Sequence, residues 1–320
     1  MALLEVNSLR TYYFTSEGVV KAVDNVSLNL ERGESLGLAG ESGCGKSTFG
    51  YSILRLVPPP GRIVGGKILF DGKDILRLDE ESFRKEYRWK RISMVFQGAM
   101  NALNPVRRIG DQIVEAILAH DENATEEEAY ERAGDLLELV GIERVRLRTY
   151  PHELSGGMKQ RVVIAMALAL NPDLLIADEP TTALDVVVQA QILNLLKELK
   201  NKLKMSLILI THDLSVIAEI ADKVAIMYAG KIVEWGTSEQ IFENPQHPYT
   251  RGLISSIPRL RGKKSLFWIP GQPPDLINPP PGCRFHPRCP YVMDRCRREE
   301  PPMIEVEPKH YITCWLYVKR

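Results

Sequence analysis

Short runs of consecutive hydrophobic residues recur along the chain, and stretches with helical spacing lie between many of them. The runs predict strands at Leu4–Leu9, Ser35–Ala39, Ile68–Phe70, Ile92–Phe96, Leu174–Ala177, Leu207–Thr211 and Lys223–Met227. Helices are predicted at Lys46–Arg55, Met158–Leu170, Val186–Lys202 and Leu214–Ile220. Several strands are apolar on both faces, which is typical of strands that helices cover on both sides. The alternation predicts an α/β fold with a mostly parallel sheet core.

The segment from about 98 to 160 has a different pattern. It carries helical spacing and no convincing strand. Thr125 and Glu128 have the spacing of a capping box, which marks the start of a helix. One apolar face follows, made by Ala129, Ala133, Leu136, Leu137 and Val140. We therefore predict an all-helical subdomain inserted into the α/β body.

The composition is that of an ordinary globular protein and narrows the function classes. The chain has 320 residues, with 41 Lys+Arg balanced by 41 Asp+Glu. A zero net charge argues against nucleic-acid binding through an overall basic surplus. No stretch approaches the ~18 apolar residues of a membrane-spanning helix, and the first residues lack the pattern of a signal peptide. We expect a cytoplasmic protein whose contact with a membrane, if it has one, is peripheral.

The composition changes near residue 237. Of the 21 prolines, 14 lie between Pro245 and Pro308. Four of the five cysteines lie in the last 38 residues, at Cys283, Cys289, Cys296 and Cys314. We predict two domains, 1–236 with the helical subdomain inside it, and a small Pro-rich C-terminal domain at 237–320.

A glycine-rich loop at Gly40–Ser47 matches the pattern of a phosphate-binding loop. It follows the predicted strand Ser35–Ala39 and opens the predicted helix at Lys46. In such a loop, glycines let backbone N–H groups turn toward the phosphates, and the helix N-terminus adds a favourable dipole. Lys46 has the position that reaches the β- and γ-phosphates, and Ser47 the position that coordinates Mg²⁺. A chance glycine-rich turn is the less favoured alternative.

Polar side chains follow three other predicted strands. Asp178 and Glu179 end the strand Leu174–Ala177, where a nucleotide site of an open α/β sheet is expected. We predict that Asp178 binds the Mg²⁺ shell and that Glu179 accepts a proton from the attacking water. His212 follows another strand and can orient that water or contact the γ-phosphate. Gln97 ends a further strand and can contact Mg²⁺ or water.

A second anion-binding helix start is predicted at Ser155-Gly156-Gly157. A serine and two glycines precede a helix here, although no phosphate-binding loop is adjacent. The simplest explanation is that these residues bind the γ-phosphate of a nucleotide held by another subunit. An ordinary N-cap is the alternative.

Taken together, these motifs resemble those of the ATP-binding subunits of ABC transporters. The resemblance implies the P-loop cassette fold, with a mostly parallel sheet core, an antiparallel β subdomain and the inserted helical subdomain. It implies that Tyr13 stacks on adenine, with its neighbours Tyr12 and Phe14 as alternatives one residue away. Two cassettes would enclose two Mg·ATP. The segment Ser155-Gly156-Gly157 of each chain, called the signature in this family, would contact the partner's nucleotide.

The residues that the resemblance implies form five groups. Those for ATP are Tyr13, Gly40, Glu41, Ser42, Gly43, Cys44, Gly45, Lys46, Ser47, Thr48 and Gln97; those of the signature are Ser155, Gly156 and Gly157. The catalytic residues are Glu179 and His212, the Mg²⁺ ligands Ser47, Gln97 and Asp178, and the D-loop residue Asp185.

Further motifs resemble the dipeptide/oligopeptide permease branch. They are Glu41-Ser42-Gly43, Leu103-Asn104-Pro105, Tyr150-Pro151-His152-Glu153 and His247-Pro248-Tyr249-Thr250. The branch implies a peripheral ATPase subunit at the cytoplasmic face of the membrane. Its partners would be a second cassette (a paralogue or an identical chain), two membrane permease subunits and, indirectly, an extracytoplasmic solute-binding protein. Alternatives are import of nickel or another small solute, a soluble ABC-type ATPase acting on nucleic acid or ribosomes, and a redox or metal sensor.

The spacing of the four late cysteines is Cys283-x5-Cys289-x6-Cys296-x17-Cys314. A zinc knuckle usually has a tight Cys-x2-4-Cys pair, which is missing here. Thiolates on longer loops can surround a larger cluster, and Cys-Pro recurs in ferredoxin-type ligation. Some peptide-permease ATPases have a similar tail with an iron–sulfur cluster. We therefore expect a structural [4Fe–4S] cluster, with Zn²⁺ as the first alternative and disulfides or unligated thiols as the next.

Overall fold

The computed structural model describes residues 2–121, 123–256 and 269–318. The chain divides into two compact units, one made of Met1–Leu76 with Leu209–Arg320 and the other of Arg77–Ile208. Strand β8 (Ser206–Ile210) contains the second boundary between them. The first unit therefore combines the N-terminal residues with the whole C-terminal region.

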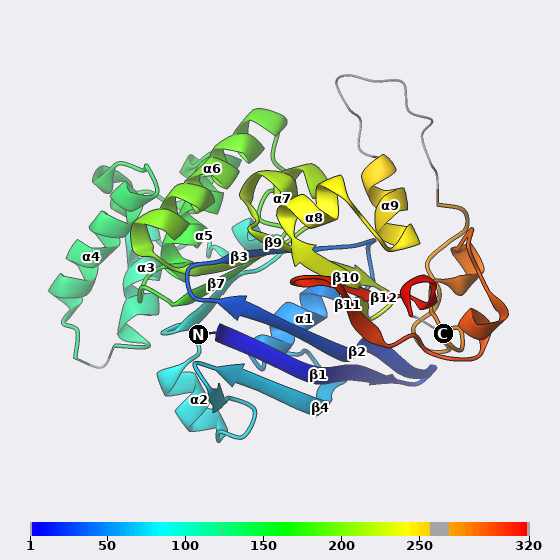
Figure 1. Ribbon diagram of the computed structural model, residues 1–320. Helices are drawn as coiled ribbons and strands as arrows, with labels where there is room; N and C mark the ends of the chain where they lie inside the picture. Colours follow the sequence, from blue (N-terminus) through cyan, green and yellow to red (C-terminus); the bar gives the residue numbers. More distant parts are fainter. Residues whose placement is uncertain (1, 122, 257–268, 319–320) are drawn as a thin grey trace. The chain divides into compact units, whose positions relative to one another are not determined.

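An antiparallel sheet forms the N-terminal part of the first unit. Its strands are β1 (Ala2–Thr15), β2 (Gly18–Glu31), β4 (Gly61–Phe70) and β5 (Lys73–Asp74), in the order β2-β1-β4-β5. Figure 1 shows β1, β2 and β4 side by side. Helix α1 (Lys46–Ile53) packs against β1 and β2. This sheet corresponds to the antiparallel subdomain that the motifs predict.

A mixed sheet forms the other part of the first unit. Strand β3 (Ser35–Ala39) pairs in parallel with β9 (Lys223–Tyr228). The next strands pair antiparallel: β10 (Lys231–Thr237) with β9, β12 (His310–Thr313) with β10, and β11 (Met303–Glu307) with β12. The Pro-rich C-terminal region thus adds two strands to a sheet that begins with β3.

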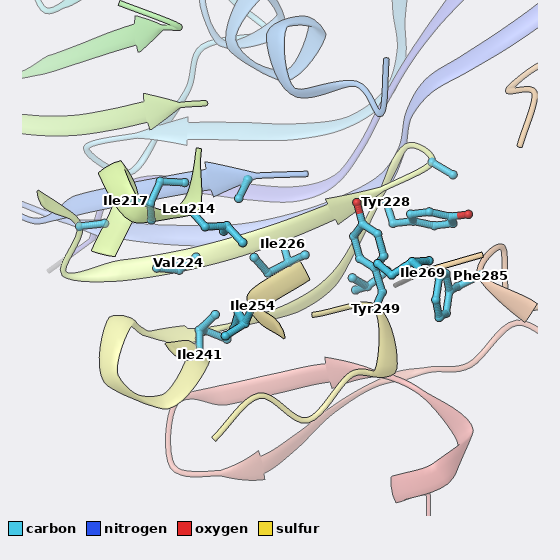
Figure 2. Packing of buried hydrophobic residues seen from close by; sticks show 14 residues of the cluster. Leu214, Ile217, Val224, Ile226, Tyr228, Ile241, Tyr249, Ile254, Ile269 and Phe285 are labelled. Carbon is cyan, nitrogen blue, oxygen red and sulfur yellow. The ribbon is translucent and has the colours of Figure 1, made fainter. Parts of the chain in front are cut away.

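The C-terminal region also shares the hydrophobic core of this unit. Its helices are α8 (Ser238–Glu243) and α9 (Pro248–Ser255), and α7 (Leu214–Ile220) precedes β9. Short 3-10 turns lie at His286–Arg288, Asp294–Arg297 and Trp315–Tyr317. Figure 2 shows Tyr228 of β9 together with Tyr249, Ile269 and Phe285 from the C-terminal region. All four side chains are buried.

The second unit is mainly helical around a pair of parallel strands. The strands are β6 (Ile92–Val95) and β7 (Leu174–Asp178), and the helices are α2 (Glu80–Glu86), α3 (Ile109–Leu118), α4 (Glu126–Leu139), α5 (Gly156–Ala167) and α6 (Val186–Leu203). Further 3-10 turns lie at Ala99–Ala102, Arg144–Arg148 and Pro151–Glu153. Between 98 and 160 the described residues contain helical elements and no strand. The predicted capping box of Thr125 and Glu128 is confirmed at the start of α4.

None of the helices in the described part of the chain is long and apolar enough to cross a membrane.

Candidate functional site

The loop between β3 and α1 has a backbone that only glycine can supply at several positions. Gly40, Gly43 and Gly45 have φ angles of 154°, 76° and 107°. A Cβ on Gly40 would lie 2.1 Å from the carbonyl oxygen of Met227, and one on Gly45 would lie 1.9 Å from that of Ala22. Since neither backbone oxygen can move away easily, these glycines fix the curl of the loop. The buried strand β3 delivers the loop to the N-terminus of α1.

Lys46 closes this loop with its own side chain. The residue is 6% exposed, and its Nζ donates to the carbonyl oxygens of Gly40 at 2.8 Å and Glu41 at 3.0 Å. Ser42 and Gly43 are exposed, so the crest of the loop faces solvent. A cation, a glycine-shaped backbone and the N–H groups of a helix start make a site suited to a phosphate chain.

Three aromatic side chains precede the loop in β1, and their contacts differ. The hydroxyl of Tyr13 lies 3.3 Å from Oγ1 of Thr48 in α1. The hydroxyl of Tyr12 donates to Asp24 at 2.7 Å, and burial together with this bond raises the pKa of Tyr12 to about 12. The guanidinium of Arg62 lies 4.6 Å from the ring centre of Phe14. Of the three, Tyr13 has a contact with the helix that follows the loop.

The C-terminal region contacts the same loop, which the sequence patterns do not predict. The backbone N–H of Glu41 donates to the hydroxyl of Tyr249 at 3.0 Å, and the carboxylate of Glu41 accepts from Arg288. Nearby, Arg284 donates to the carbonyl oxygen of Ala229 and pairs with Asp24. Tyr249 belongs to the His247–Thr250 motif, so a signal for it was present. The arginines carry no such signal in the sequence.

In the second unit, the two acids that end β7 have different surroundings. Asp178 is fully buried, whereas Glu179 is partly exposed and has a left-handed backbone with φ of 45°. The Oε2 atom of Glu179 accepts from Nε2 of Gln97 at 3.1 Å and from Oγ1 of Thr182 at 3.0 Å. The structure therefore brings Gln97 and Glu179 together and leaves the two acids in different surroundings.

The helix start at α5 has the form that the sequence predicts. Ser155 is the exposed N-cap, and its hydroxyl accepts from the N–H of Met158 at 3.3 Å. A Cβ on Gly157 would lie 2.6 Å from Cγ1 of Val188 in α6. Asp185 caps α6 by accepting from the N–H of the same Val188 at 3.0 Å. Val188 therefore contacts both segments: its side chain lies against Gly157 of the signature, and its N–H is bonded to the D-loop residue Asp185.

His212 belongs to the first unit and follows the end of β8. Its side chain is exposed, and it lies between Thr211, whose N–H donates to the carbonyl oxygen of Leu38 at 3.3 Å, and Asp213, the N-cap of α7. It therefore sits in a short connection whose backbone is held on both sides.

None of the five cysteines, all of which lie in the described ranges, forms a disulfide. The pKa of Cys283 is raised to about 11 and that of Cys314 to about 12, mainly by burial and in part by the neighbouring cysteines. The N–H of Cys283 donates to the carbonyl oxygen of Cys296 at 2.9 Å. In the parts of the chain that the structure describes, no group of three or more His, Cys, Asp or Glu residues is arranged to hold a metal ion. The predicted cluster ligands share one region but do not form a ready-made ligand set.

Comparison with known families assigns both parts of the chain. The sequence model of the ABC transporter family matches residues 23–182. That of the oligopeptide/dipeptide transporter C-terminal region matches residues 233–296.

The chain is also similar to individual curated proteins over nearly its whole length. It is 52% identical over 319 residues to the oligopeptide transport ATP-binding protein OppD of Bacillus subtilis (strain 168), covering 98% of this chain and 88% of that protein. It is 47% identical over 317 residues to the dipeptide transport ATP-binding protein DppD of Caldanaerobacter subterraneus subsp. tengcongensis, covering 98% and 97%.

Solved structures resemble the chain over about three quarters of its length. The ATP-binding cassette MJ0796, in a dimeric post-hydrolysis state bound to ADP and Pi, superposes with a TM-score of 0.65 at 29% identity, covering 73% of this chain and 98% of that one. The protein cbiO1 from Clostridium perfringens, part of the cbiONQ transporter complex, superposes with a TM-score of 0.66 at 30% identity, covering 76% and 91%.

Proposed function

The chain belongs to the ABC transporter family, as an ATP-binding subunit of its oligopeptide and dipeptide importers, and we propose that it powers import by closing with a second cassette around two Mg·ATP. The reaction converts ATP and water to ADP and phosphate and is coupled to movement of the peptide. Two membrane permease subunits are its partners at the cytoplasmic face of the membrane, and a solute-binding protein delivers the peptide to them. The second cassette is a paralogue or an identical chain.

One observation carries the proposal: in the described part of the chain, two helix starts have the form that suits a bound anion. The first is the glycine loop before α1, and the second is α5 with its exposed Ser155 cap and Gly156. Of the two, the first has a lysine that reaches its own loop. The second is therefore assigned to the triphosphate of the other cassette. The dimeric MJ0796 structures, one of them with ADP and Pi, support this pairing.

The residues of the first helix start fit a magnesium nucleotide. Lys46 already donates to two loop carbonyls, and an ammonium held there compensates the charge of the β- and γ-phosphates. Tyr13 stacks on adenine, and its contact with Thr48 supports this choice over Tyr12 and Phe14. By the resemblance to other ABC cassettes, Ser47, Gln97 and Asp178 would supply oxygen ligands to Mg²⁺, which would offset negative charge on the phosphates.

Glu179 is assigned as the general base for the attacking water. Its Oε2 accepts from Gln97 and Thr182, and these two bonds fix the direction of the carboxylate that takes up the proton. Asp178 is the last residue of β7 and is buried, and it is assigned as a ligand of the Mg²⁺ ion. His212 orients the water or contacts the γ-phosphate, and Asp185 lies in the D-loop.

The substitution Glu179→Gln tests this proposal. The amide keeps the size of the side chain but cannot accept the proton, so ATP should bind while hydrolysis falls at least about a hundredfold. The closed pair should accumulate with ATP and Mg²⁺, as measured by light scattering of the purified transporter ATPases. Glu198→Gln, an exposed change elsewhere in the same unit, serves as the matched control. Normal turnover in Glu179→Gln would remove Glu179 from its role.

For the C-terminal cysteines we propose a structural [4Fe–4S] cluster ligated by Cys283, Cys289, Cys296 and Cys314. Four cysteines in one region, widely spaced and not joined in disulfides, support it. The described residues show no group of three or more His, Cys, Asp or Glu side chains arranged to hold a metal ion, and the proposed cluster has no part in ATP hydrolysis.

Anaerobic purification followed by iron, sulfide and zinc analysis tests the cluster. We expect about four iron and four sulfide per chain. Cys289→Ser should lower both, whereas Cys44→Ser, which changes the cysteine of the phosphate-binding loop, should leave both unchanged. Stoichiometric zinc without iron would overturn the cluster in favour of a zinc site.

A further inference from the structure

Tyr249 contacts the backbone of the phosphate-binding loop at Glu41. The residue is fully buried, and its hydroxyl accepts the N–H of Glu41 at 3.0 Å. Its ring lies 4.6 Å from that of Tyr228 and 5.4 Å from that of Phe285 (Figure 2). Because both neighbours are buried, the phenol has little freedom to move away from the loop.

The turn before Tyr249 fixes it further. His247 is the N-cap of α9, and its Nδ1 accepts the N–H of Tyr249 at 3.0 Å. The N–H of His247 donates to the buried carboxylate of Glu234 at 2.8 Å. Pro248 occupies the first helical position, where its fixed φ favours the helix start. The bonds within the His-Pro-Tyr motif therefore hold Tyr249 in place, and the Tyr249 hydroxyl contacts the loop at the N–H of Glu41.

Arg288 holds the side chain of the same loop residue. Its Nη1 and Nη2 donate to the two carboxylate oxygens of Glu41 at 2.7 and 3.0 Å. The guanidinium is itself held, since Nε donates to the carbonyl oxygen of Pro270 at 2.8 Å. The arginine side chain is 6% exposed and that of Glu41 is 26% exposed. A two-point pair in such surroundings fixes direction as well as distance.

Glu41 is therefore contacted at every polar group. The Tyr249 hydroxyl accepts from its N–H, Arg288 donates to its carboxylate, and Lys46 donates to its carbonyl oxygen. Through that carbonyl, the position of Glu41 sets the position of the Lys46 ammonium. The loop is built by the residues before α1, yet two of these three contacts come from the C-terminal region.

We propose that Tyr249 and Arg288 are positioning residues for ATP binding, which hold Glu41 so that the phosphate-binding loop and Lys46 keep the shape that receives the triphosphate. The inference rests on the proposed role of this loop in ATP binding. It also explains what the His-Pro-Tyr motif does, because the motif and the arginine before Cys289 fasten the C-terminal region to the nucleotide site.

The first test removes one oxygen from Tyr249. Tyr249→Phe keeps the ring packing, and ATP binding to the full chain with Mg²⁺ should weaken roughly threefold to tenfold, the factor of one lost hydrogen bond. Hydrogen exchange should quicken in the peptide that covers residues 40–46. Tyr317→Phe is the matched control, because the Tyr317 hydroxyl bonds within the C-terminal region, to the carbonyl oxygen of Gln246 and to Arg251. Its ATP affinity and loop exchange should equal those of the parent.

The second test examines the two-point pair by a double-mutant cycle. Arg288→Lys keeps the positive charge but loses the two parallel N–H donors of the guanidinium. Glu41→Gln keeps the size of the side chain but loses its negative charge. Each should weaken ATP binding about threefold or more, and the double variant should be no weaker than the weaker single. Arg295→Lys is the control, since Arg295 pairs with exposed Glu299 away from the loop. Independent, additive effects would contradict a shared action through Glu41.

The proposed function and the positioning role of Tyr249 and Arg288 can be tested separately. Lys46→Ala should lower ATP affinity strongly, and unchanged affinity there would overturn the proposed function. If Lys46→Ala loses binding while Tyr249→Phe and Arg288→Lys match the parent in ATP affinity and in loop exchange, the positioning role is wrong and the proposed function stands. A lower unfolding temperature with unchanged ATP affinity would likewise overturn the positioning role, because a merely structural contact gives that result.

Discussion

Single glycines show most directly how neighbouring elements determine the proposed nucleotide site. Gly40 and Gly45 lie against backbone oxygens from β9 and β2, so their need for glycine comes from other strands. Gly157 is different, because its φ is that of an ordinary helix and its constraint is the methyl group of Val188. One residue type therefore serves two purposes, a curled backbone in the loop and a close helix contact in the signature.

Gly157→Ala separates these purposes. Alanine favours a helix over glycine by about 1 kcal/mol, yet its Cβ would lie 2.6 Å from Cγ1 of Val188 and push α5 from α6. We expect ATPase activity of the assembled transporter to fall about tenfold or more, with ATP affinity of the isolated chain unchanged. Val188→Ala in the same chain should restore activity by making room. A double variant as inactive as Gly157→Ala would show that crowding is not the cause.

At the residue scale, the sequence predicts those parts of the site that lie within one short segment. Lys46, Asp178 and Glu179 each belong to a local motif whose spacing carries the chemistry. The bond between Glu41 and Tyr249 joins positions 208 apart, and only the folded chain shows that these two meet. Arg288 is harder still, because arginines are common in the tail and nothing in its neighbours marks it as buried.

Among the elements, those with continuous apolar runs were predicted closely. The expected Ser35–Ala39 coincides with β3, and the expected helix Leu214–Ile220 coincides with α7. The sequence patterns do not predict strands β10, β11 and β12. Strands β11 and β12 are short and follow a Pro-rich stretch, whereas β10 has seven residues and Glu234 interrupts its apolar run. They are held by pairing with one another and with β9, a long-range effect that local patterns do not report. Strand β2 was missed although Val26, Leu28 and Leu30 alternate with polar residues.

The cap of α9 predicts a dependence of stability on pH. The pKa of His247 is lowered to about 4, mainly by burial; Glu234 opposes this shift and Arg251 contributes to it. The neutral ring is the form that caps, because Nδ1 accepts the N–H of Tyr249. In the unfolded chain the ordinary pKa is about 6.5, so the unfolded state takes up the proton first as pH falls. The contribution of the neutral His247 ring to the free energy of unfolding is fully present above pH ~6.5. It is lost as the pH falls toward ~4, and the loss amounts to at most about 3 kcal/mol.

Urea unfolding at several pH values between about 7.5 and 5 measures this loss. His247→Asn keeps an oxygen that can cap the helix and removes the titration, so its stability should change less with pH than that of the parent. His152→Asn, at an exposed position in the second unit, should retain the parent's pH dependence. An equal loss in the parent and in His247→Asn would contradict the role of this imidazole.

On the scale of the whole molecule, the C-terminal region is part of the first unit's core. Its Phe285 is buried against Tyr228, with ring centres 5.2 Å apart, and against Tyr249 (Figure 2). Composition alone marks this region as Pro-rich and different from the rest. It does not show that two of the region's strands extend the sheet of β9 and β10, since that depends on chain topology.

Phe285→Ala tests this shared core. Removing a buried phenyl should lower the free energy of unfolding by about 3–5 kcal/mol. The loss should appear in unfolding followed by tyrosine and tryptophan fluorescence of the full chain. Tyr291→Ala removes an aromatic ring from the same region at a position that is 53% exposed, and it should change stability by less than about 1 kcal/mol. Equal effects of the two changes would refute the shared core.

Arg284 and Arg288 each adjoin a cysteine of the tail, Cys283 and Cys289, and each reaches the N-terminal part of the chain. Under the proposed positioning role, a ligand of these cysteines that favours the observed placement of Arg288 also favours ATP binding. Bound ATP must then raise the affinity for that ligand by the same factor, as thermodynamic linkage requires. Removing such a ligand is therefore expected to weaken the binding of ATP.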